Sequence, residues 1–425
     1  MNGLYLSLIL HLAHSAYSFK RVRRLTIHNI ISLWFSFAVL MGVISVEFEF
    51  YQAVHKEIYH LPYEAYIYEF IGFLIFIWPF RYLDDNTTLS GMPDNNKQLK
   101  IIIKGLVVLF VFYFLLLLKV YFYISQYDLV DSYESLQDTG DSLYKYSWIE
   151  GKIAWVGGNF YRWFAPLLVI YTISMMIKDK TGKKLPVSMF YLFIVCGCKL
   201  LLNISRGGRG GVFWFIILMI FVLLPFFKQL AKPSKRILLK VVPIFIGLSF
   251  VYAMIMSVMR TANSDAETPV TQVVRYLGEP YPHLGNAFWD EVRMHPMGIR
   301  FFPLLLGAEN LNESYDYADT FEFIMGVPIK NYPTMYGDFY CEFGKNGALI
   351  AIFLLSLFFY IFVRKRPYTF SKYPIIYLYL QIAVTGPYWF SQRGNVGTMT
   401  FLAVIIMYFV IEAMTNKKQL TVRKS

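Results

Sequence analysis

The sequence predicts an all-helical polytopic membrane protein with about eleven transmembrane helices. Of the 425 residues, 56% are hydrophobic and only 16% are charged, and the mean hydropathy is +0.45. This composition excludes an ordinary water-soluble enzyme. Apolar runs of roughly 18–24 residues recur along the chain, and each is long enough to cross a hydrocarbon core roughly 30 Å thick. The runs are too long and too evenly apolar to be strands of a membrane barrel, so we expect helices.

The apolar runs define the expected spans. The first run precedes its positive cluster, whereas a secretory signal carries its charges before the apolar region, so we expect this run to be retained. No tandem repeat and no linker separates a soluble domain, so residues 1–425 are expected to form a single membrane domain. The expected spans are 3–19, 28–46, 61–80, 101–125, 153–177, 186–205, 211–227, 237–259, 346–363, 373–390 and 396–414.

Basic residues predict the orientation, because they occupy every second connection between the spans. They lie at 20–24, at Arg81 with Lys97 and Lys100, at 178–184, 228–240 and 364–366, and in the tail at 417–424. Cytoplasmic loops of membrane proteins carry an excess of Lys and Arg, so these connections are expected in the cytoplasm. The alternate connections then face outward, with the N-terminus outside and the C-terminus in the cytoplasm. The longest connection, residues 260–345, faces outward and is rich in Tyr, Pro, Gly and Asn, which suits a loop that handles a polar substrate. The net charge of +12 is spread over short loops and not gathered in one patch, which disfavours nucleic acid as a partner.

A second set of basic residues falls in the outward half, where the orientation rule does not place them. Lys199 and Arg206 lie seven residues apart in one expected span, so they share a helix face about 10 Å apart, with Asn203 between them. Cations within apolar sequence face a protein interior or a water-filled cavity and are candidates for function. The other members of the set are Lys119, Arg162, Arg209, Arg260, Arg275, Arg293, Arg300 and Arg393.

Two glycine-bearing turns add to this set. The run from Asn203 to Gly211 contains Arg206 and Arg209 among four glycines. Glycines let the backbone approach an anion, and guanidinium groups bind phosphate oxygens bidentately. A flexible hairpin with two snorkelling arginines is the alternative. A second Arg-Gly pair, Arg393-Gly394, at another outward turn favours a site for a lipid diphosphate.

The long outer loop offers candidates for acid–base chemistry. Glu279 and His283 lie four residues apart and are candidate bases for a hydroxyl acceptor, while Tyr281 and nearby tyrosines are suited to stacking on sugars. An ordinary loop carboxylate and a solvated histidine are the alternative. Glu69, midway along the third span, is expected to pair with one of the outer arginines, and a role in a proton relay is the alternative. No metal and no cofactor are expected, because the cysteines and the remaining histidines show no metal-ligand spacing. These histidines are expected at the membrane interface; they include His11, His14, His28, His55 and His60.

Together these features resemble the bacterial O-antigen and capsule polymerase family, the oligosaccharide repeat unit polymerases of the Wzy type. The matching residues are Ser205-Arg206-Gly207 and Glu342-Phe343-Gly344-Lys345-Asn346-Gly347. The resemblance implies a GT-C-like glycosyltransferase in the bacterial cytoplasmic (inner) membrane. It implies transfer of a growing glycan from undecaprenyl diphosphate to a hydroxyl of the next lipid-linked repeat unit, in O-antigen, capsule or exopolysaccharide synthesis. Membrane lipid and a chain-length regulator protein are the further partners.

The resemblance also suggests roles for the candidate residues. Diphosphate is the leaving group, and Arg206, Arg209 and Arg393 are expected to stabilise it without a metal. Glu279 or His283 is expected to serve as the acceptor base. The residues expected to bind substrate in a supporting basic cavity are Arg162, Lys199, Asn203, Arg260, Arg275 and Tyr281.

Other functions remain open from the sequence. An O-antigen ligase, which moves a finished glycan from the same carrier to a lipid A-type acceptor, requires the same diphosphate cavity. A flippase for lipid-linked oligosaccharide is a transporter, whose charges are expected across both leaflets, often with a two-fold repeat. The clustering of unexplained cations in the outer half and the odd number of spans favour the enzyme. A membrane scaffold without turnover is the third alternative.

Overall fold

A computed structural model describes residues 2–23, 26–55, 58, 61–83, 89–90, 97–126, 144–205, 209–261, 268–306, 315–328, 333–364 and 368–422. Within these ranges the elements are helical, apart from a two-residue parallel pairing of β1 (Leu89–Ser90) with β2 (Tyr368–Thr369). The predicted all-helical class is confirmed.

The helices follow one another in this order: α1 (Asn2–Val22), α2 (Ile27–Glu47), α3 (Tyr63–Ile77), η1 (Trp78–Tyr82), α4 (Lys97–Ile124), α6 (Trp148–Lys178), α7 (Leu185–Ile204), α8 (Arg209–Leu223), η2 (Leu224–Gln229), α9 (Lys232–Thr261), α10 (Pro269–Gly278), α11 (Pro280–His283), η3 (Leu284–Phe288), α12 (Tyr315–Met325), α13 (Met335–Val363), η4 (Phe370–Lys372), α14 (Tyr373–Thr385) and α15 (Gly394–Val422).

Six of the described helices are long and apolar enough to cross a membrane, which makes this a multi-pass membrane protein. They are α2, α4, α6, α7, α13 and the Gly394–Met414 part of α15. Helices also occupy the other five expected ranges, namely α1, α3, α8 with η2, α9 and α14. These five are shorter or more polar, so the count of eleven spans stays a prediction.

The chain forms two compact units, and each is assembled from segments that are distant in the sequence. The first unit comprises residues 1–86, 257–364 and 379–399, and the second comprises residues 87–256, 365–378 and 400–425. Because the chain passes repeatedly between the units, neither is a continuous stretch that a linker separates from the rest.

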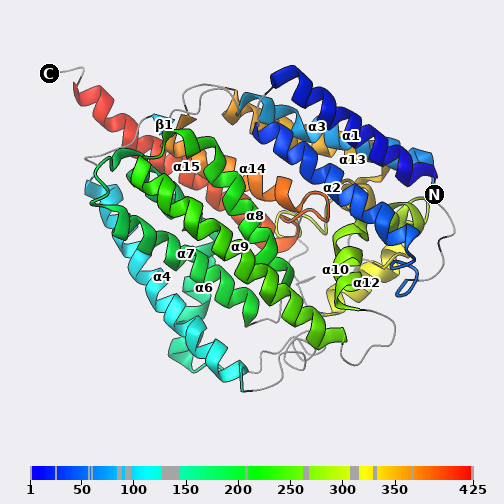
Figure 1. Ribbon diagram of the computed structural model, residues 1–425, viewed down its shortest axis with the longest axis horizontal. Coiled ribbons are helices and arrows are strands. Elements are labelled where there is room, and N and C mark those ends of the chain that lie inside the picture. Colours follow the sequence, from blue (N-terminus) through cyan, green and yellow to red (C-terminus); the bar gives the residue numbers. More distant parts are fainter. Residues whose placement is uncertain are drawn as a thin grey trace. The chain divides into compact units, whose positions relative to one another are not determined.

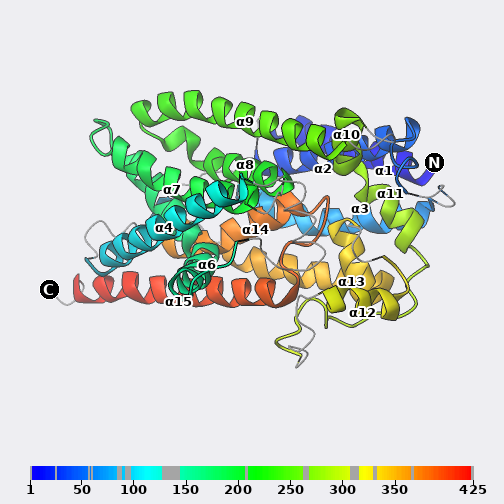
Figure 2. The ribbon, with the colours of Figure 1, turned by 90° about the horizontal axis from the view of Figure 1, so that it is seen from below.

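In the first unit, α1, α2, α3 and α13 pack together (Figure 1). Helix α2 begins after Thr26, whose side chain accepts a hydrogen bond of 3.2 Å from the backbone N–H of Asn29. Near the other end of α2 lie α10 and α11 (Figure 2). A Cβ at Gly278 of α10 would come within 2.3 Å of the backbone of Met41, so the absence of a side chain is what lets these helices touch.

Helix α13 bends at Gly344, which has φ +71° and ψ −177°. This region of backbone conformation is essentially restricted to glycine. The bend leaves the carbonyl of Glu342 outside the helical ladder, where it accepts a 2.9 Å hydrogen bond from the backbone N–H of Met297. The Glu342-Phe343-Gly344 motif therefore marks the point where a short polar helix gives way to the apolar part of α13.

In the second unit, α4, α6 and α7 pack together (Figure 2). The hydroxyl of Tyr161 on α6 donates a 2.8 Å hydrogen bond to the carbonyl of Val195 on α7. On α7, Gly197 lies against the ring of Phe114, where a Cβ would approach a ring carbon to 2.6 Å. Small residues thus permit close helix contact in this bundle.

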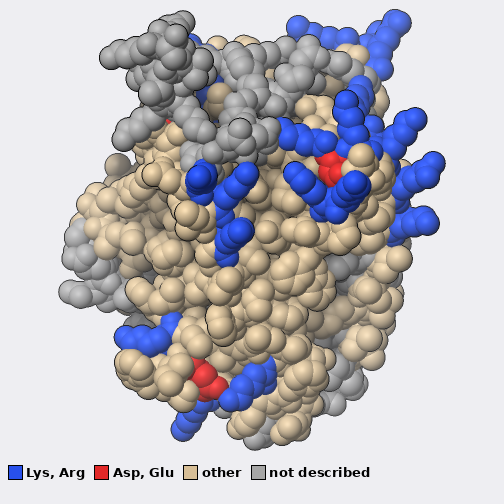
Figure 3. All heavy atoms as spheres, turned by 90° about the vertical axis from the view of Figure 1, so that its left-hand side faces the viewer, with Lys and Arg blue, Asp and Glu red and all other residues tan. Residues whose placement is uncertain are grey.

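Connections that the sequence predicts to face the same side lie together in the second unit. The backbone N–H of Ala231 donates a 3.2 Å hydrogen bond to the carbonyl of Met176, which joins the basic connection 178–184 to the basic connection 228–240. The pairing of β1 with β2 likewise joins the connection after α3 to the connection after α13. One face of the molecule gathers Lys and Arg, whereas Asp and Glu are sparse there (Figure 3).

Candidate functional site

Five polar side chains of the first unit form a compact group that we call the His–Glu cluster. Tyr51 and His55 lie in the turns that follow α2. Arg275 lies in the last turn of α10, Glu279 joins α10 to α11, and His283 ends α11. The cluster therefore brings together residues from two connections, 47–60 and 260–345, and these residues are more than 200 positions apart in the sequence.

The contacts within the cluster centre on Glu279 and His283. The Oε2 atom of Glu279 lies 3.4 Å from Nε2 of His55, and Arg275 donates to the same oxygen at 2.5 Å. The Nδ1 atom of His283 lies 2.9 Å from the Tyr51 hydroxyl. The rings of His55 and His283 meet edge to face with their centroids 4.4 Å apart. Both Glu279 and His283 are buried.

Burial and neighbouring charges set the protonation of these two groups. Burial lowers the pKa of His283 to about 3, against the opposing effect of the Glu279 carboxylate. Burial alone would raise the pKa of Glu279, but the hydrogen bond with His55 and the positive charge of Arg275 contribute to bringing it below its ordinary value. Both groups are unprotonated at neutral pH and can accept a proton, although each is a weaker base than its unperturbed counterpart.

A second polar group of the same unit, which we call the charge network, contains Arg300, Asp338, Glu342 and Arg393. Arg300 is only 3% exposed and donates to Glu342 at 2.7 Å and to Asp338 at 3.0 Å. Arg393 donates to Asp338 at 3.0 Å, and the backbone N–H of Phe390 donates to the other Asp338 oxygen at 2.8 Å. Two guanidinium groups and two carboxylates give the network a formal charge of zero.

The charge network modifies the expectation for Arg393. This arginine, predicted to face a diphosphate, is 28% exposed and forms an ion pair with Asp338. Its guanidinium is therefore held in a fixed direction, and part of its charge is already balanced by the carboxylate.

The expected pairing of Glu69 with an outer arginine is also corrected. Its carboxylate lies 3.1 Å from Nε2 of His11, and both side chains are almost fully buried. The predicted arginine partner is therefore wrong, because α1 packs against α3 and places a histidine opposite the carboxylate. His11 is also not an interfacial residue, since its side chain is fully buried.

Several predicted residues lie in the second unit. Arg162 is exposed on α6, and the side-chain amide of Asn203 donates a 2.7 Å hydrogen bond to the carbonyl of Lys199 one turn earlier on α7. Arg206 lies outside the described residues, and Arg209 begins α8, where its side chain is likewise not among the described parts.

Two further residues predicted to bind substrate, Arg260 and Tyr281, lie in the first unit. Arg260 belongs to α9, and its side chain is not described. Tyr281 is fully buried, and its backbone carbonyl accepts a 3.1 Å hydrogen bond from the Tyr66 hydroxyl. Its ring therefore presents no exposed face on which a sugar stacks, in contrast to the expectation.

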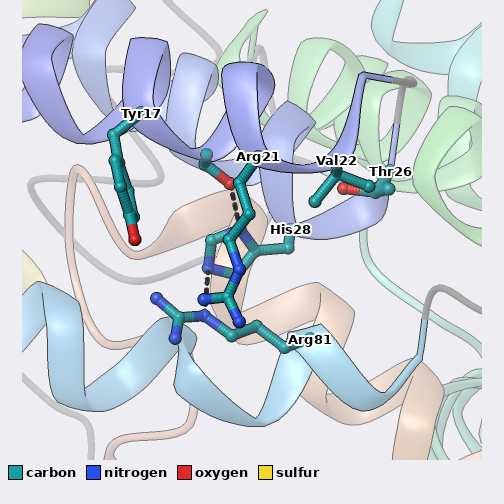
Figure 4. A pocket seen from close by; sticks show the side chains of 7 residues that line it. Tyr17, Arg21, Val22, Thr26, His28 and Arg81 are labelled. Atoms are coloured by element: carbon teal, nitrogen blue, oxygen red, sulfur yellow. Dashed lines mark hydrogen bonds between the residues drawn. The ribbon is translucent and has the colours of Figure 1, made fainter.

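A basic pocket of about 200 Å³ lies at the opposite end of α2 from the His–Glu cluster. Figure 4 shows Arg21 and Arg81 reaching toward His28, which lies 3.4 Å from Arg81 Nε and 3.0 Å from the Ser18 hydroxyl. The 21 residues of α2 correspond to a length of roughly 30 Å, so the pocket and the cluster are separated by about the thickness of a bilayer core. The remaining lining residues are Tyr17, Val22 and Thr26.

Sequence reasoning found Arg275, Glu279 and His283 but missed Tyr51 and His55. Their only signal was the orientation rule, which placed the connection between the second and third spans on the same side as the long loop. Arg21 and Arg81 were predicted as cytoplasmic charges, and their joint pocket with His28 had no local signal.

No family model, no curated protein and no solved structure matches this chain. Function is therefore argued from the residues and their geometry.

Proposed function

We propose that this chain is a glycosyltransferase that polymerises lipid-linked oligosaccharide repeat units on the outer face of the cytoplasmic membrane. The observation that carries the proposal is the His–Glu cluster, which places an ionised carboxylate, two imidazoles and a guanidinium beside one end of a membrane helix. Buried groups of this kind in a membrane protein are candidates for chemistry on a polar substrate.

The proposed topology has eleven spans in a GT-C-like arrangement, with the N-terminus outside and the C-terminus in the cytoplasm. Three adjacencies support it. The Arg21–Arg81 pocket unites two connections predicted to be cytoplasmic, the His–Glu cluster unites two predicted to be outward, and the charge network joins the long loop to the outward turn at Arg393. Each adjacency agrees with the alternation of basic and non-basic connections.

In the proposed reaction, Glu279 accepts the proton of the acceptor sugar hydroxyl. The hydroxyl oxygen forms a bond to the anomeric carbon of the donor glycan, and the bond from that carbon to the undecaprenyl diphosphate oxygen breaks. The diphosphate leaves with the bonding electron pair. Arg275 and His55 position Glu279, since both contact the same carboxylate oxygen.

Cations are proposed to stabilise the leaving diphosphate. Arg206, Arg209 and Arg393 take this role, and Asp338 fixes the direction of the Arg393 guanidinium. A guanidinium binds phosphate oxygens bidentately, so Lys at these positions is expected to function poorly. The further residues proposed to bind the substrate are Arg162, Lys199 and Arg260.

Gel analysis of surface polysaccharide tests the proposal in cells whose own copy of the gene is deleted. Deletion is expected to leave lipid core with one repeat unit, and the wild-type chain is expected to restore the ladder of lengths. Arg206→Ala and Glu279→Gln are expected to fail at wild-type abundance in the membrane. Lys183→Gln, in a connection proposed to be cytoplasmic, is the matched control and is expected to restore the ladder.

The alternative outcomes separate the competing functions. Loss of every repeat unit from the core would make a ligase or a flippase the leading interpretation. A normal ladder with Arg206→Ala would remove the proposed diphosphate site, and a strong defect in Lys183→Gln would contradict the proposed orientation.

A further inference from the structure

We propose that His55, Glu279 and His283 together bind one divalent transition-metal ion of the Zn²⁺ class. The three residues each offer one ligand atom, and these atoms all lie within 4.8 Å of one another. Two imidazoles and one carboxylate are a ligand set that zinc accepts, and three protein ligands leave a fourth coordination position open.

One pair of ligand atoms already has the separation that a tetrahedral ion needs. Ligand atoms about 2.1 Å from zinc at tetrahedral angles lie about 3.4 Å apart. The distance from His55 Nε2 to Glu279 Oε2 is 3.4 Å. The third ligand atom lies within 4.8 Å of both others, so each of its two distances needs to shorten by at most about 1.4 Å to reach this separation.

His283 supplies an independent indication of a ligand. Its Nε2 atom is buried and has no hydrogen-bond partner among the residues that the structure describes, and the whole side chain is only 1% exposed. A buried polar atom without a partner is unfavourable, and metal coordination would satisfy it. The other ring nitrogen contacts the Tyr51 hydroxyl at 2.9 Å, so a proton on Nδ1 leaves the lone pair of Nε2 available.

Arg275 disfavours binding of a metal cation, because its positively charged guanidinium donates to the same Glu279 oxygen that faces His55. A carboxylate has further acceptor positions and can hold a guanidinium and a metal together. The positive charge of Arg275 nevertheless weakens metal binding, so its removal is expected to tighten it. A general loss of structure would have the opposite effect, which makes Arg275 a discriminating position.

Metal binding has a consequence for activity that rests on the proposed function. A Glu279 carboxylate that ligates zinc is no longer available to accept the proton of the acceptor hydroxyl. Zinc is therefore expected to inhibit glycan polymerisation by purified protein, and a chelator is expected to reverse the inhibition.

The test uses the full-length chain, purified in detergent and stripped of metal by a chelator, with Zn²⁺ as the probe in equilibrium dialysis. One ion per chain is expected. His55→Ala and Glu279→Gln are expected to weaken binding by at least about tenfold, and Tyr51→Phe by up to about tenfold through loss of ring orientation. Arg275→Gln is expected to tighten it by roughly tenfold, from the removal of one like charge at close range.

His295→Gln is the matched control, because this histidine belongs to the same unit and contacts the Cys341 carbonyl instead of the cluster. Its affinity for Zn²⁺ is expected to equal that of the wild type. Co²⁺ substitution gives a spectroscopic check, since nitrogen and oxygen ligands produce visible d–d bands without the near-ultraviolet thiolate band that cysteine ligands produce.

Three results would overturn the site: no stoichiometric Zn²⁺, equal affinity in His55→Ala and the wild type, or a thiolate band with Co²⁺. Metal-free size-exclusion profiles and unfolding temperatures identify variants that have not folded, and the tightening by Arg275→Gln does not depend on any weakened variant. Stoichiometric zinc without inhibition would leave the metal site standing and remove Glu279 as the acceptor base, so the two proposals fail separately.

Discussion

Replacing Asp338 by Asn tests the charge balance of the buried network. The carboxylate accepts from Arg300, Arg393 and the backbone N–H of Phe390, and it is fully buried. Asn keeps the shape and one acceptor oxygen but leaves a net charge of +1 among buried groups. Breaking a buried ion pair from one side costs about 3–5 kcal/mol, and the remaining Glu342 partner of Arg300 places the expected loss near the lower limit, about 3 kcal/mol.

The assay is thermal and denaturant unfolding of the purified protein in detergent, with Asp290→Asn as the control. Asp290 is 62% exposed and pairs with Lys345 at 3.0 Å, so its loss is expected to cost less than about 1 kcal/mol. Adding Arg393→Gln to Asp338→Asn restores neutrality and is expected to recover part of the stability. Equal, small losses of stability for Asp338→Asn and Asp290→Asn would refute the reasoning. So would a double variant whose loss of stability equals the sum of the losses of Asp338→Asn and Arg393→Gln measured singly.

Three further outcomes follow from local contacts. Gly344→Ala is expected to destabilise the protein by about 1–3 kcal/mol in the unfolding assay because of the glycine-only backbone conformation, whereas Gly105→Ala, with open space around it, is expected to be neutral or slightly stabilising. Lys119→Gln removes a 2.6 Å ion pair with Glu150 whose lysine is 63% exposed, so the unfolding free energy is expected to stay at the wild-type level. Although burial alone would raise it, hydrogen bonds from the Lys184 backbone and Thr181 hold the pKa of Asp179 below its ordinary value. Its stabilising contribution is therefore present above the unfolded-state pKa and lost as the pH falls through the lowered one, and Asp179→Asn is expected to flatten the acid limb of a stability–pH curve.

The helix positions followed from the sequence because each apolar run is matched to the thickness of the bilayer. A helix lies at every expected range, and the bend at Gly344 begins the expected span at 346–363 with an offset of one or two residues. The i,i+4 arrangement of Arg275, Glu279 and His283 could also be predicted from the sequence, since a single helical path through α10 and α11 brings the three side chains together.

The sequence could not predict which residues from distant segments contact one another, because side-chain pairing between helices depends on which helix faces pack together. His55 and Tyr51 reach the cluster only through the contact of α2 with α10 and α11. Asp338 and Glu342 lie four residues apart in the expected outer loop, but nothing in the sequence indicates that both pair with Arg300. Aromatic burial was likewise misjudged at Tyr281, because the glycine contact between α2 and α10 leaves no space around it.

The charge network makes the helices at the end of the chain depend on segments far upstream. Arg300, Asp338 and Glu342 alone would carry one uncompensated negative charge, and Arg393, more than fifty residues after Glu342, supplies the second guanidinium. A chain truncated before this turn therefore lacks a counter-ion for the buried Asp338 carboxylate as well as helix α15.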